Sequence, residues 1–130
     1  MTDREWNDSQ PIYRQLRDLV AANIIDGVLQ EGDPLPSVRN VAAEYRVNPL
    51  TVLKSYQRLV DEDLVEAKRG RGMFIKPGAR NLLLAGERQR FLTEEWPRVH
   101  ATIQRLGLTP QELLDAANAN GSAPDPPTER

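Results

Sequence analysis

The sequence predicts a mainly α-helical protein in which three helices and a β-hairpin are followed by a short helical region. Apolar residues recur at helical spacing in three successive segments. Two short apolar runs, residues 64–67 and 73–76, then flank a turn at 68–72 that contains Arg and Gly. Helical spacing returns after Pro77-Gly78, a pair typical of a boundary.

The first two helices follow from apolar spacing and from residues that favour helix ends. The first should run from about Ile12 to Asp26, with Gly27 as its C-cap. The second should begin after Ser37, because a serine hydroxyl can accept a hydrogen bond from an unpaired N–H at a helix start. The expected inner faces are Ile12, Leu16, Leu19, Val20 and Ile24 in the first helix, and Val38, Val41, Ala42 and Tyr45 in the second.

The third helix, expected at residues 49–61, has the clearest start. Asn48 is a favourable N-cap, Pro49 suits the first helical position, and Val47 and Val52 are spaced as a hydrophobic staple. Its inner face is predicted to hold Val52, Tyr56 and Leu59, and its outer face Leu50, Lys54, Gln57 and Arg58, with Thr51 at the flank. Two helices joined by a tight turn and followed by a hairpin constitute a winged helix-turn-helix.

Composition excludes several classes of site. The chain has 130 residues, no Cys and one His, so a disulfide framework, a Cys-based zinc site and a multi-histidine metal site within one chain are excluded. His100 is more simply a surface residue. The sequence contains no catalytic triad, no paired carboxylates and no glycine-rich phosphate loop, and we expect neither an enzyme nor a cofactor. The N-terminus does not resemble a signal peptide and no run could span a bilayer, which favours the cytoplasm.

Charge is concentrated locally rather than overall. The net charge is −2, yet residues 68–76 carry four basic side chains and no acidic one. Arg supplies positive charge at this hairpin tip, and Gly allows backbone N–H groups to approach phosphates closely. Arg39, in the first turn of the second helix, opposes the helix dipole and therefore favours a functional interpretation. These features predict contact with nucleic acid at one face.

The C-terminal region is predicted to dimerise. Residues 80–106 should be helical, with a kink or break at Pro97 and an end at Gly107. Thr109 and Glu112 are spaced as a capping box for a last short helix. A second copy is the most economical cover for the apolar face of this region. The residues expected in the dimer interface are Leu83, Phe91, Trp96, Val99, Ile103 and Leu106. We expect a DNA-binding domain at 10–77, a dimerisation region at 78–117 and a disordered tail at 118–130.

Several motifs together resemble the DNA-binding domain of the GntR family of bacterial transcription regulators. They are Pro-Ile-Tyr-Arg-Gln-Leu at 11–16, Gly-Asp-Pro-Leu-Pro-Ser-Val-Arg at 32–39, Val-Asn-Pro-Leu-Thr-Val at 47–52, Tyr-Gln-Arg-Leu at 56–59 and Arg-Gly-Arg-Gly-Met-Phe at 69–74. The Asn-Pro helix start and the short C-terminal region are similar to the YtrA-type subfamily. That resemblance implies a homodimer held by C-terminal helices and no large effector domain.

The resemblance also implies which residues contact double-stranded DNA. In this family the Pro-Ser-x-Arg motif contacts bases or phosphates, the start of the third helix enters the major groove, and the wing contacts phosphates or the minor groove. The corresponding residues are Ser37, Arg39, Asn48, Leu50, Thr51, Lys54, Arg58, Arg69, Gly70 and Arg71. Leu50 departs from the pattern, because related sequences often carry a polar residue there. A leucine can contact a thymine methyl group but forms no hydrogen bonds with a base.

The sequence therefore predicts a regulator, most simply a repressor, that binds a palindromic operator as a homodimer. Two other functions are alternatives. A winged helix can also serve as a protein-interaction module without DNA affinity, although the basic tip argues against this. An aminotransferase-like fusion enzyme, known elsewhere in the family, would need more than the roughly 52 residues that follow Gly78. An unidentified small-molecule effector is compatible with the sequence, but no residue defines its site.

Overall fold

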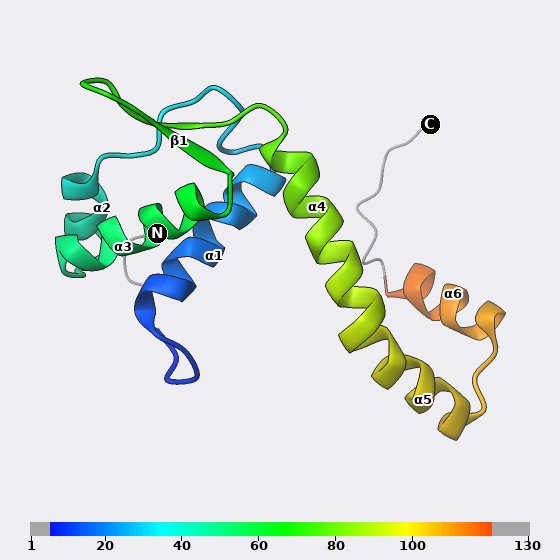
Figure 1. The fold of residues 1–130 in the computed structure, drawn as a ribbon. Helices are drawn as coiled ribbons and strands as arrows, with labels where there is room; N and C mark the ends of the chain where they lie inside the picture. Colours follow the sequence, from blue (N-terminus) through cyan, green and yellow to red (C-terminus); the bar gives the residue numbers. More distant parts are fainter. Residues whose placement is uncertain (1–5, 121–130) are drawn as a thin grey trace. The chain divides into compact units, whose positions relative to one another are not determined.

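A computed structural model describes residues 6–120 of the chain, which divide into two compact units (Figure 1). The first unit extends to Glu87 and the second begins at Arg88. The first contains α1 (Ile12–Ile25), α2 (Val38–Tyr45), α3 (Pro49–Asp61), β1 (Val65–Lys68), β2 (Gly72–Ile75) and the start of α4 (Ala79–Arg90). The second contains the end of α4, a π-helical turn η1 (Phe91–Glu95), α5 (Trp96–Leu106) and α6 (Pro110–Ala119).

The first unit is a winged helix-turn-helix, as predicted. Helix α3 packs against both α1 and α2, and the antiparallel hairpin β1–β2 follows it (Figure 1). The hairpin pairs Val65 with Ile75 at its base and Lys68 with Gly72 at its tip. The segment before α2 runs beside β2, where the Leu35 N–H donates to the Met73 carbonyl at 2.8 Å. The wing is therefore fixed to the helix-turn-helix by backbone hydrogen bonds.

One apolar core holds this unit together. The predicted inner faces mostly agree with it, since Val52, Tyr56 and Leu59 of α3 are all buried. Ile12 is an exception, because this first residue of α1 is exposed. The core consists of Leu16, Val20, Ala21, Ile24, Leu35, Val41, Ala42, Val52, Tyr56, Leu59, Leu64, Val65, Ile75, Ala79 and Leu83. Its last two members come from α4, so the unit continues past the hairpin.

The segment before α1 is tied down by a buried polar residue that the apolar pattern did not indicate. The Gln15 side-chain amide donates to the backbone carbonyls of Asn7 and Gln10 at 2.8 and 2.7 Å, and its oxygen accepts from the Asn7 N–H. Trp6 packs against the core, with its ring centroid 6.2 Å from that of Tyr45. Residues 1–5 lie outside the described residues.

All regular secondary structure of the second unit is helical. Pro97 was expected to kink or split the long helical stretch, and it lies in the first turn of α5, just after η1 separates α5 from α4. Gly107 ends α5 in the left-handed conformation (φ 69°), and Thr109 and Glu112 form the predicted capping box of α6. Helix α6 continues to Ala119, two residues beyond its expected end, so the predicted tail at 118–130 begins too early. Residues 121–130 lie outside the described residues.

Leu83, predicted to lie in the dimer interface, is instead buried in the core of the first unit. Helical spacing places it on an apolar face, but that face of α4 is covered by its own chain. The other five predicted interface residues belong to the second unit. None of the residues from 88 to 120 is buried, and no described helix is long and apolar enough to cross a membrane.

Candidate nucleic-acid interface

The start of α2 presents Arg39 to solvent. Ser37 caps the helix as predicted, since its Oγ accepts a hydrogen bond from the Asn40 N–H at 3.0 Å. The hydroxyl hydrogen of Ser37 is still available to donate. Arg39 is exposed at the second position of the helix, and the first turn contains no acidic residue. The helix end therefore combines an exposed guanidinium with a positive dipole, an arrangement that suits an anionic partner.

The start of α3 is fixed by Asn48. Its side-chain oxygen accepts from the Leu50 N–H at 2.8 Å, and its amide NH₂ group is a donor that this cap does not use. Leu50, two residues after the cap, has 72% of its surface exposed, and Thr51 is half-buried at the flank. Because Val52 is fully buried one residue later, the rotation of α3 about its axis is set by the core. The core thus determines which α3 residues face outward.

Lys54 continues this outer face, one turn after Leu50. It is exposed, and its ammonium group lies 4.2 Å from the centre of the Tyr13 ring on α1. A hydrogen bond with Arg14 lowers the pKa of Tyr13; burial opposes this change, and the positive charges of Arg14, Lys54 and Arg58 add smaller lowering effects. Arg14, Lys54 and Arg58 thus place positive charge near this edge of α1 and α3. Tyr13 is a neighbour of the predicted site that spacing along α3 alone does not reveal.

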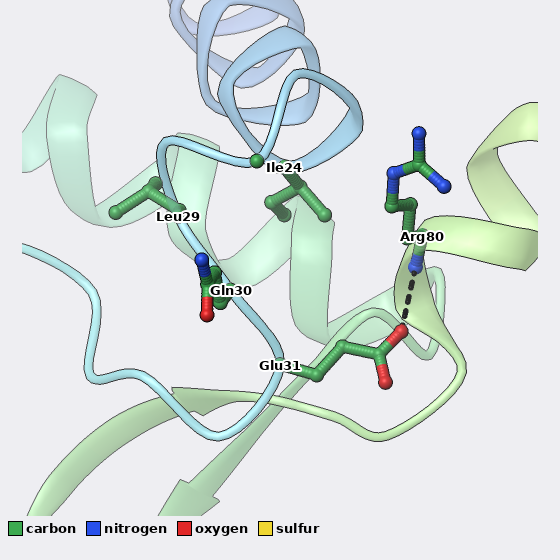
Figure 2. Close-up of a pocket in the computed structure, with 6 residues that line it drawn as sticks. Ile24, Leu29, Gln30, Glu31 and Arg80 are labelled. Atoms are coloured by element: carbon green, nitrogen blue, oxygen red, sulfur yellow. Dashed lines mark hydrogen bonds between the residues drawn. The ribbon is translucent and has the colours of Figure 1, made fainter.

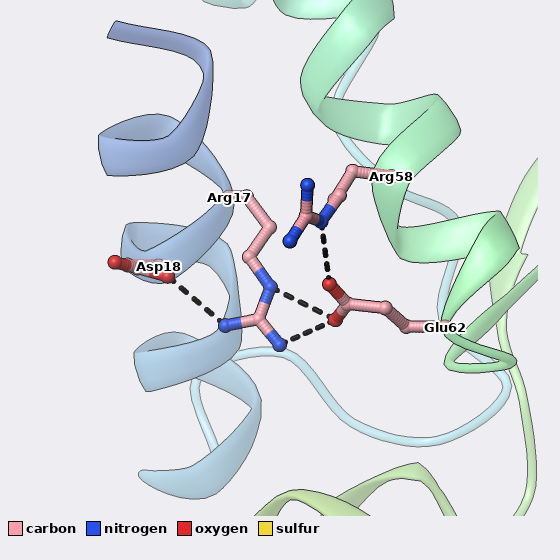
Figure 3. Close-up of polar contacts among 4 residues, drawn as sticks. All are labelled: Arg17, Asp18, Arg58 and Glu62. Carbon is pink, nitrogen blue, oxygen red and sulfur yellow. Dashed lines mark hydrogen bonds and ion pairs between the residues drawn. The ribbon is translucent and has the colours of Figure 1, made fainter. Parts of the chain in front are cut away.

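Arg58, also predicted to contact DNA, is engaged elsewhere. Its Nε donates to Glu62 at 2.9 Å, and Arg17 of α1 donates to the other oxygen of the same carboxylate, with its Nε at 3.0 Å (Figure 3). Partial burial raises the pKa of Glu62, but the hydrogen bonds and charges of the two arginines outweigh this effect and lower it. The structure therefore groups Arg58 with a clasp between α1 and α3, which we call the Glu62 clasp (Arg17, Arg58 and Glu62).

The wing carries exposed positive charges at its tip. Arg69, Gly70 and Arg71 are exposed, and the turn is closed by the Arg71 N–H, which donates to the Lys68 carbonyl at 2.8 Å. Gly70 has φ 74°, a conformation that costs a glycine little and other residues more. Below the tip, the Phe74 ring has the Lys68 ammonium 4.8 Å and the Arg71 guanidinium 5.9 Å from its centre. Aromatic contact of this kind orients the cations without neutralising them.

Two of the predicted DNA-contacting residues, one before α2 and one on the wing, line the same hollow. A hollow of about 290 Å³ is lined by Ser37 at the start of α2 and by Arg71 at the wing tip, although 34 positions separate them in the chain. Its floor includes Tyr56, whose hydroxyl donates to the Pro36 carbonyl at 2.6 Å. Burial, with a smaller contribution from Tyr45, raises the pKa of Tyr56 to about 12, so this donor stays protonated. The hollow therefore lies between the wing and the helix-turn-helix.

Leu53 is an outward residue that the sequence pattern did not single out. It is 44% exposed, and it lies three positions after Leu50 on α3. Helical spacing places it at the flank, between the buried face and the outer face, so periodicity alone does not decide its exposure. With Leu50, it gives the first half of α3 two exposed leucines.

A second hollow lies where α1 ends and α4 begins. It measures about 280 Å³ and is lined by Ile24, Gly27, Leu29, Gln30, Glu31 and Arg80. Figure 2 shows the Arg80 backbone N–H donating to the Glu31 carboxylate, at 3.3 Å. The Arg80 Nε donates to the Ile25 carbonyl at 2.8 Å. The unidentified effector considered from the sequence stays a hypothesis. Within residues 6–120, no group of three or more His, Cys, Asp or Glu is arranged to hold a metal ion.

The exposed arginines on α2 and the wing, the capped outward helix and the fold together define a winged-helix regulator. Comparison with known proteins identifies its family. The model for bacterial regulatory proteins of the gntR family matches residues 12–75. The chain is 34% identical over 114 residues to the uncharacterized HTH-type transcriptional regulator YhcF of Bacillus subtilis, covering 87% of this chain and 92% of that protein. The protein belongs to the GntR family of transcription regulators.

Two further similarities agree with this assignment. The HTH-type transcriptional repressor YtrA of Bacillus subtilis is 39% identical over 79 residues, which cover 61% of each chain. A GntR family transcriptional regulator from Listeria monocytogenes has a similar structure, with a TM-score of 0.68 at 27% identity over 88% of this chain and 98% of that one. The latter match extends beyond the winged helix into the C-terminal helices.

Proposed function

We propose that the protein represses transcription by binding a palindromic operator in double-stranded DNA as a homodimer. The observation that carries this proposal is the outward face of the first unit. It combines the capped α3, the exposed Arg39 and the arginine-bearing wing, and the buried face of α3 fixes which of its residues point outward. Membership in a family of transcription regulators supports the same function, and the repressor name of YtrA supports repression. Acting on DNA in a bacterial cell would place the protein in the cytoplasm.

In this proposal, α3 lies in the major groove. Its residues Asn48, Leu50, Thr51 and Lys54 contact the base edges. Ser37 and Arg39 would contact bases or phosphates beside it. Arg69, Gly70 and Arg71 would contact phosphates or the adjacent minor groove, where arginine is favoured. Arg58 would contribute least, because the Glu62 clasp already neutralises it.

A dimer is proposed because the second unit exposes an apolar face that it does not cover. Trp96, Val99, Ile103 and Leu106 follow one another at helical spacing on α5, and Phe91 precedes them on η1. Each large side chain contributes about 1.5–3 kcal/mol when fully buried, so several of them in each of two chains can outweigh an association cost of roughly 4–15 kcal/mol. Two-fold symmetry would place half-sites about one helical turn of DNA, or a small multiple of it, apart.

Binding to DNA fragments from the region upstream of the protein's own gene tests the proposal. Affinity should fall steeply with salt, because Lys and Arg at phosphates release counterions. Arg39→Ala should weaken operator binding by about 1–3 kcal/mol, if Arg39 contacts a base, and Arg69→Ala with Arg71→Ala should also reduce the salt dependence. Arg88→Ala removes an exposed arginine near the end of α4 and is the charge-matched control.

Unchanged operator affinity in folded Arg39 and Arg69/Arg71 variants would show that this face does not contact DNA. Salt-insensitive binding to a protein partner, with no affinity for any DNA, would instead support the protein-interaction module.

A further inference from the structure

The first half of α3 exposes two leucines where a DNA-reading helix would offer polar groups. Leu50 is 72% and Leu53 is 44% exposed, although the opposite face of the same helix is buried. Residues three apart on a helix are surface neighbours, with Cβ atoms roughly 5–6 Å from each other. The two side chains therefore form one small apolar surface, which we call the leucine pair.

The charges around the leucine pair suit a polyanion. Lys54 is adjacent to Leu53, and the first turn of α3 has no acidic residue. The acidic residues Asp61 and Glu62 come at the other end of the helix. The helix dipole adds partial positive charge at the end where the leucines lie. Apolar side chains framed by a cation and a positive helix end fit a groove bordered by phosphates better than an apolar protein surface.

Major-groove chemistry offers these leucines one kind of partner. A leucine side chain has no hydrogen-bond donor or acceptor, and the apolar group that a base pair displays in the major groove is the C5-methyl of thymine. Successive base pairs are about 3.4 Å apart along a strand. Two side chains separated by roughly 5–6 Å can thus meet methyl groups on adjacent or next-but-one base pairs.

We propose that Leu50 and Leu53 together read two thymine methyl groups in each operator half-site. The inference rests on the proposed function, since it requires α3 in the major groove. It adds the chemical feature that the helix selects and makes Leu53 a specificity-determining residue. Half-sites bound by this protein would therefore contain two thymines one or two steps apart at the position of α3.

Replacing thymine by deoxyuridine tests the inference at the level of single methyl groups. Deoxyuridine keeps every hydrogen-bonding group of thymine and lacks only the methyl. The preferred half-site is first selected from a random DNA pool with the full-length protein, and each thymine in it is then replaced in turn. We expect two positions at which the replacement weakens binding about four-fold per half-site, the value for losing one buried apolar carbon.

Alanine variants then assign the two methyl groups. Leu50→Ala should abolish the effect of deoxyuridine at one position, Leu53→Ala at the other, and the double variant at both. Both leucines are exposed, so these changes should leave the core intact. Val28→Ala is the matched control, because Val28 is an aliphatic residue of the same unit, 69% exposed, that lies after α1. It should retain both effects.

The possible failures are distinct. If the protein selects a defined site but no thymine in it responds to deoxyuridine, or the responses persist unchanged in the double alanine variant, the leucine pair does not read methyl groups and DNA binding still stands. If no defined site is selected and no DNA is bound, the proposed function and this inference both fail.

Discussion

The two units of the chain differ in how their apolar surface is covered. The first unit buries many of its apolar residues in one core that draws on three helices, the hairpin and the start of α4. Between residues 88 and 120, by contrast, the helices bury no side chain, and Phe91, Leu92, Trp96, Val99, Leu106, Leu108 and Leu114 are exposed. The first unit therefore has a core within one chain, and we propose that the second covers its apolar face by association.

The difference is sharpest between two leucines that share one sequence pattern. Leu83 is 6% and Leu106 is 62% exposed, although both were predicted to lie in the dimer interface. We expect Leu83→Ala to lower the free energy of unfolding by about 2–4 kcal/mol, because it leaves a cavity in a packed core. Leu106→Ala should leave the unfolding of the first unit unchanged and weaken only self-association. Urea unfolding followed by circular dichroism, with sedimentation of the same samples, separates the two effects.

Equal destabilisation by the two substitutions would contradict this division of roles. The same reasoning affects the choice of fragment for an isolated DNA-binding unit. A fragment that ends at Gly78 would lose Ala79 and Leu83 from the core, so the fragment should end at Glu87. We expect that longer fragment to be a folded monomer that binds operator DNA weakly, because its two half-sites are no longer held together.

A charge placed on the apolar face of α5 should break association. Ile103→Glu would bury a carboxylate between two copies, and we expect dimerisation to be lost and operator affinity to fall at least about 100-fold, since the second half-site then binds independently. Ala101→Glu adds the same charge on the opposite side of α5, where the residue is exposed, and should have little effect. Sedimentation and DNA titration of both variants measure the outcome. Intact dimers of Ile103→Glu would place the interface elsewhere.

The Glu62 clasp should give the first unit a modest dependence on pH. Because the pKa of Glu62 is lowered in the folded protein from its ordinary value of 4.5, its contribution to stability is present above that value and is lost as the pH falls through the lowered pKa. Glu62→Gln should remove this dependence and lower the free energy of unfolding at pH 7 by about 1 kcal/mol, a figure reduced for partial solvent exposure.

Glu66→Gln is a suitable control for the clasp, since the Glu66 carboxylate is 4.0 Å from the Lys68 ammonium in a solvent-exposed pair. It should change stability by less than about 0.5 kcal/mol. Unfolding curves collected between pH 3 and pH 7 compare the two variants, and parallel pH profiles for wild type and Glu62→Gln would contradict the role of the clasp. Operator binding at pH 7 should survive in Glu62→Gln, because the clasp lies beside the outward face of α3.

Much of the fold followed from residues that interact within a few positions of one another. Ser37, Asn48 and Thr109 cap their helices as predicted, because the oxygen that accepts and the N–H that donates lie two or three residues apart. The hairpin and the end of α5 at Gly107 depend on equally local preferences. The buried face of α3 followed from helical periodicity.

Features that depend on distant residues could not be predicted in this way. Helical periodicity placed Arg58 on the outward face of α3. It could not show that Glu62 binds both Arg58 and Arg17, because Arg17 is 45 positions from Glu62. Leu83 lies on an apolar face whose partner only the fold identifies. Leu53 falls at the flank of α3, where exposure depends on how closely neighbouring elements approach. The proximity of Ser37 and Arg71 likewise requires the wing to be docked.

Mass in solution tests most directly whether the second unit is a dimerisation element. We expect light scattering of the full-length protein at micromolar concentration, without DNA, to give twice the 14.7 kDa of one chain. The Ile103→Glu variant should give the mass of a single chain under the same conditions. A mass near 14.7 kDa for the unmodified protein would contradict the proposed homodimer, and the exposed face of α5 would then need another partner.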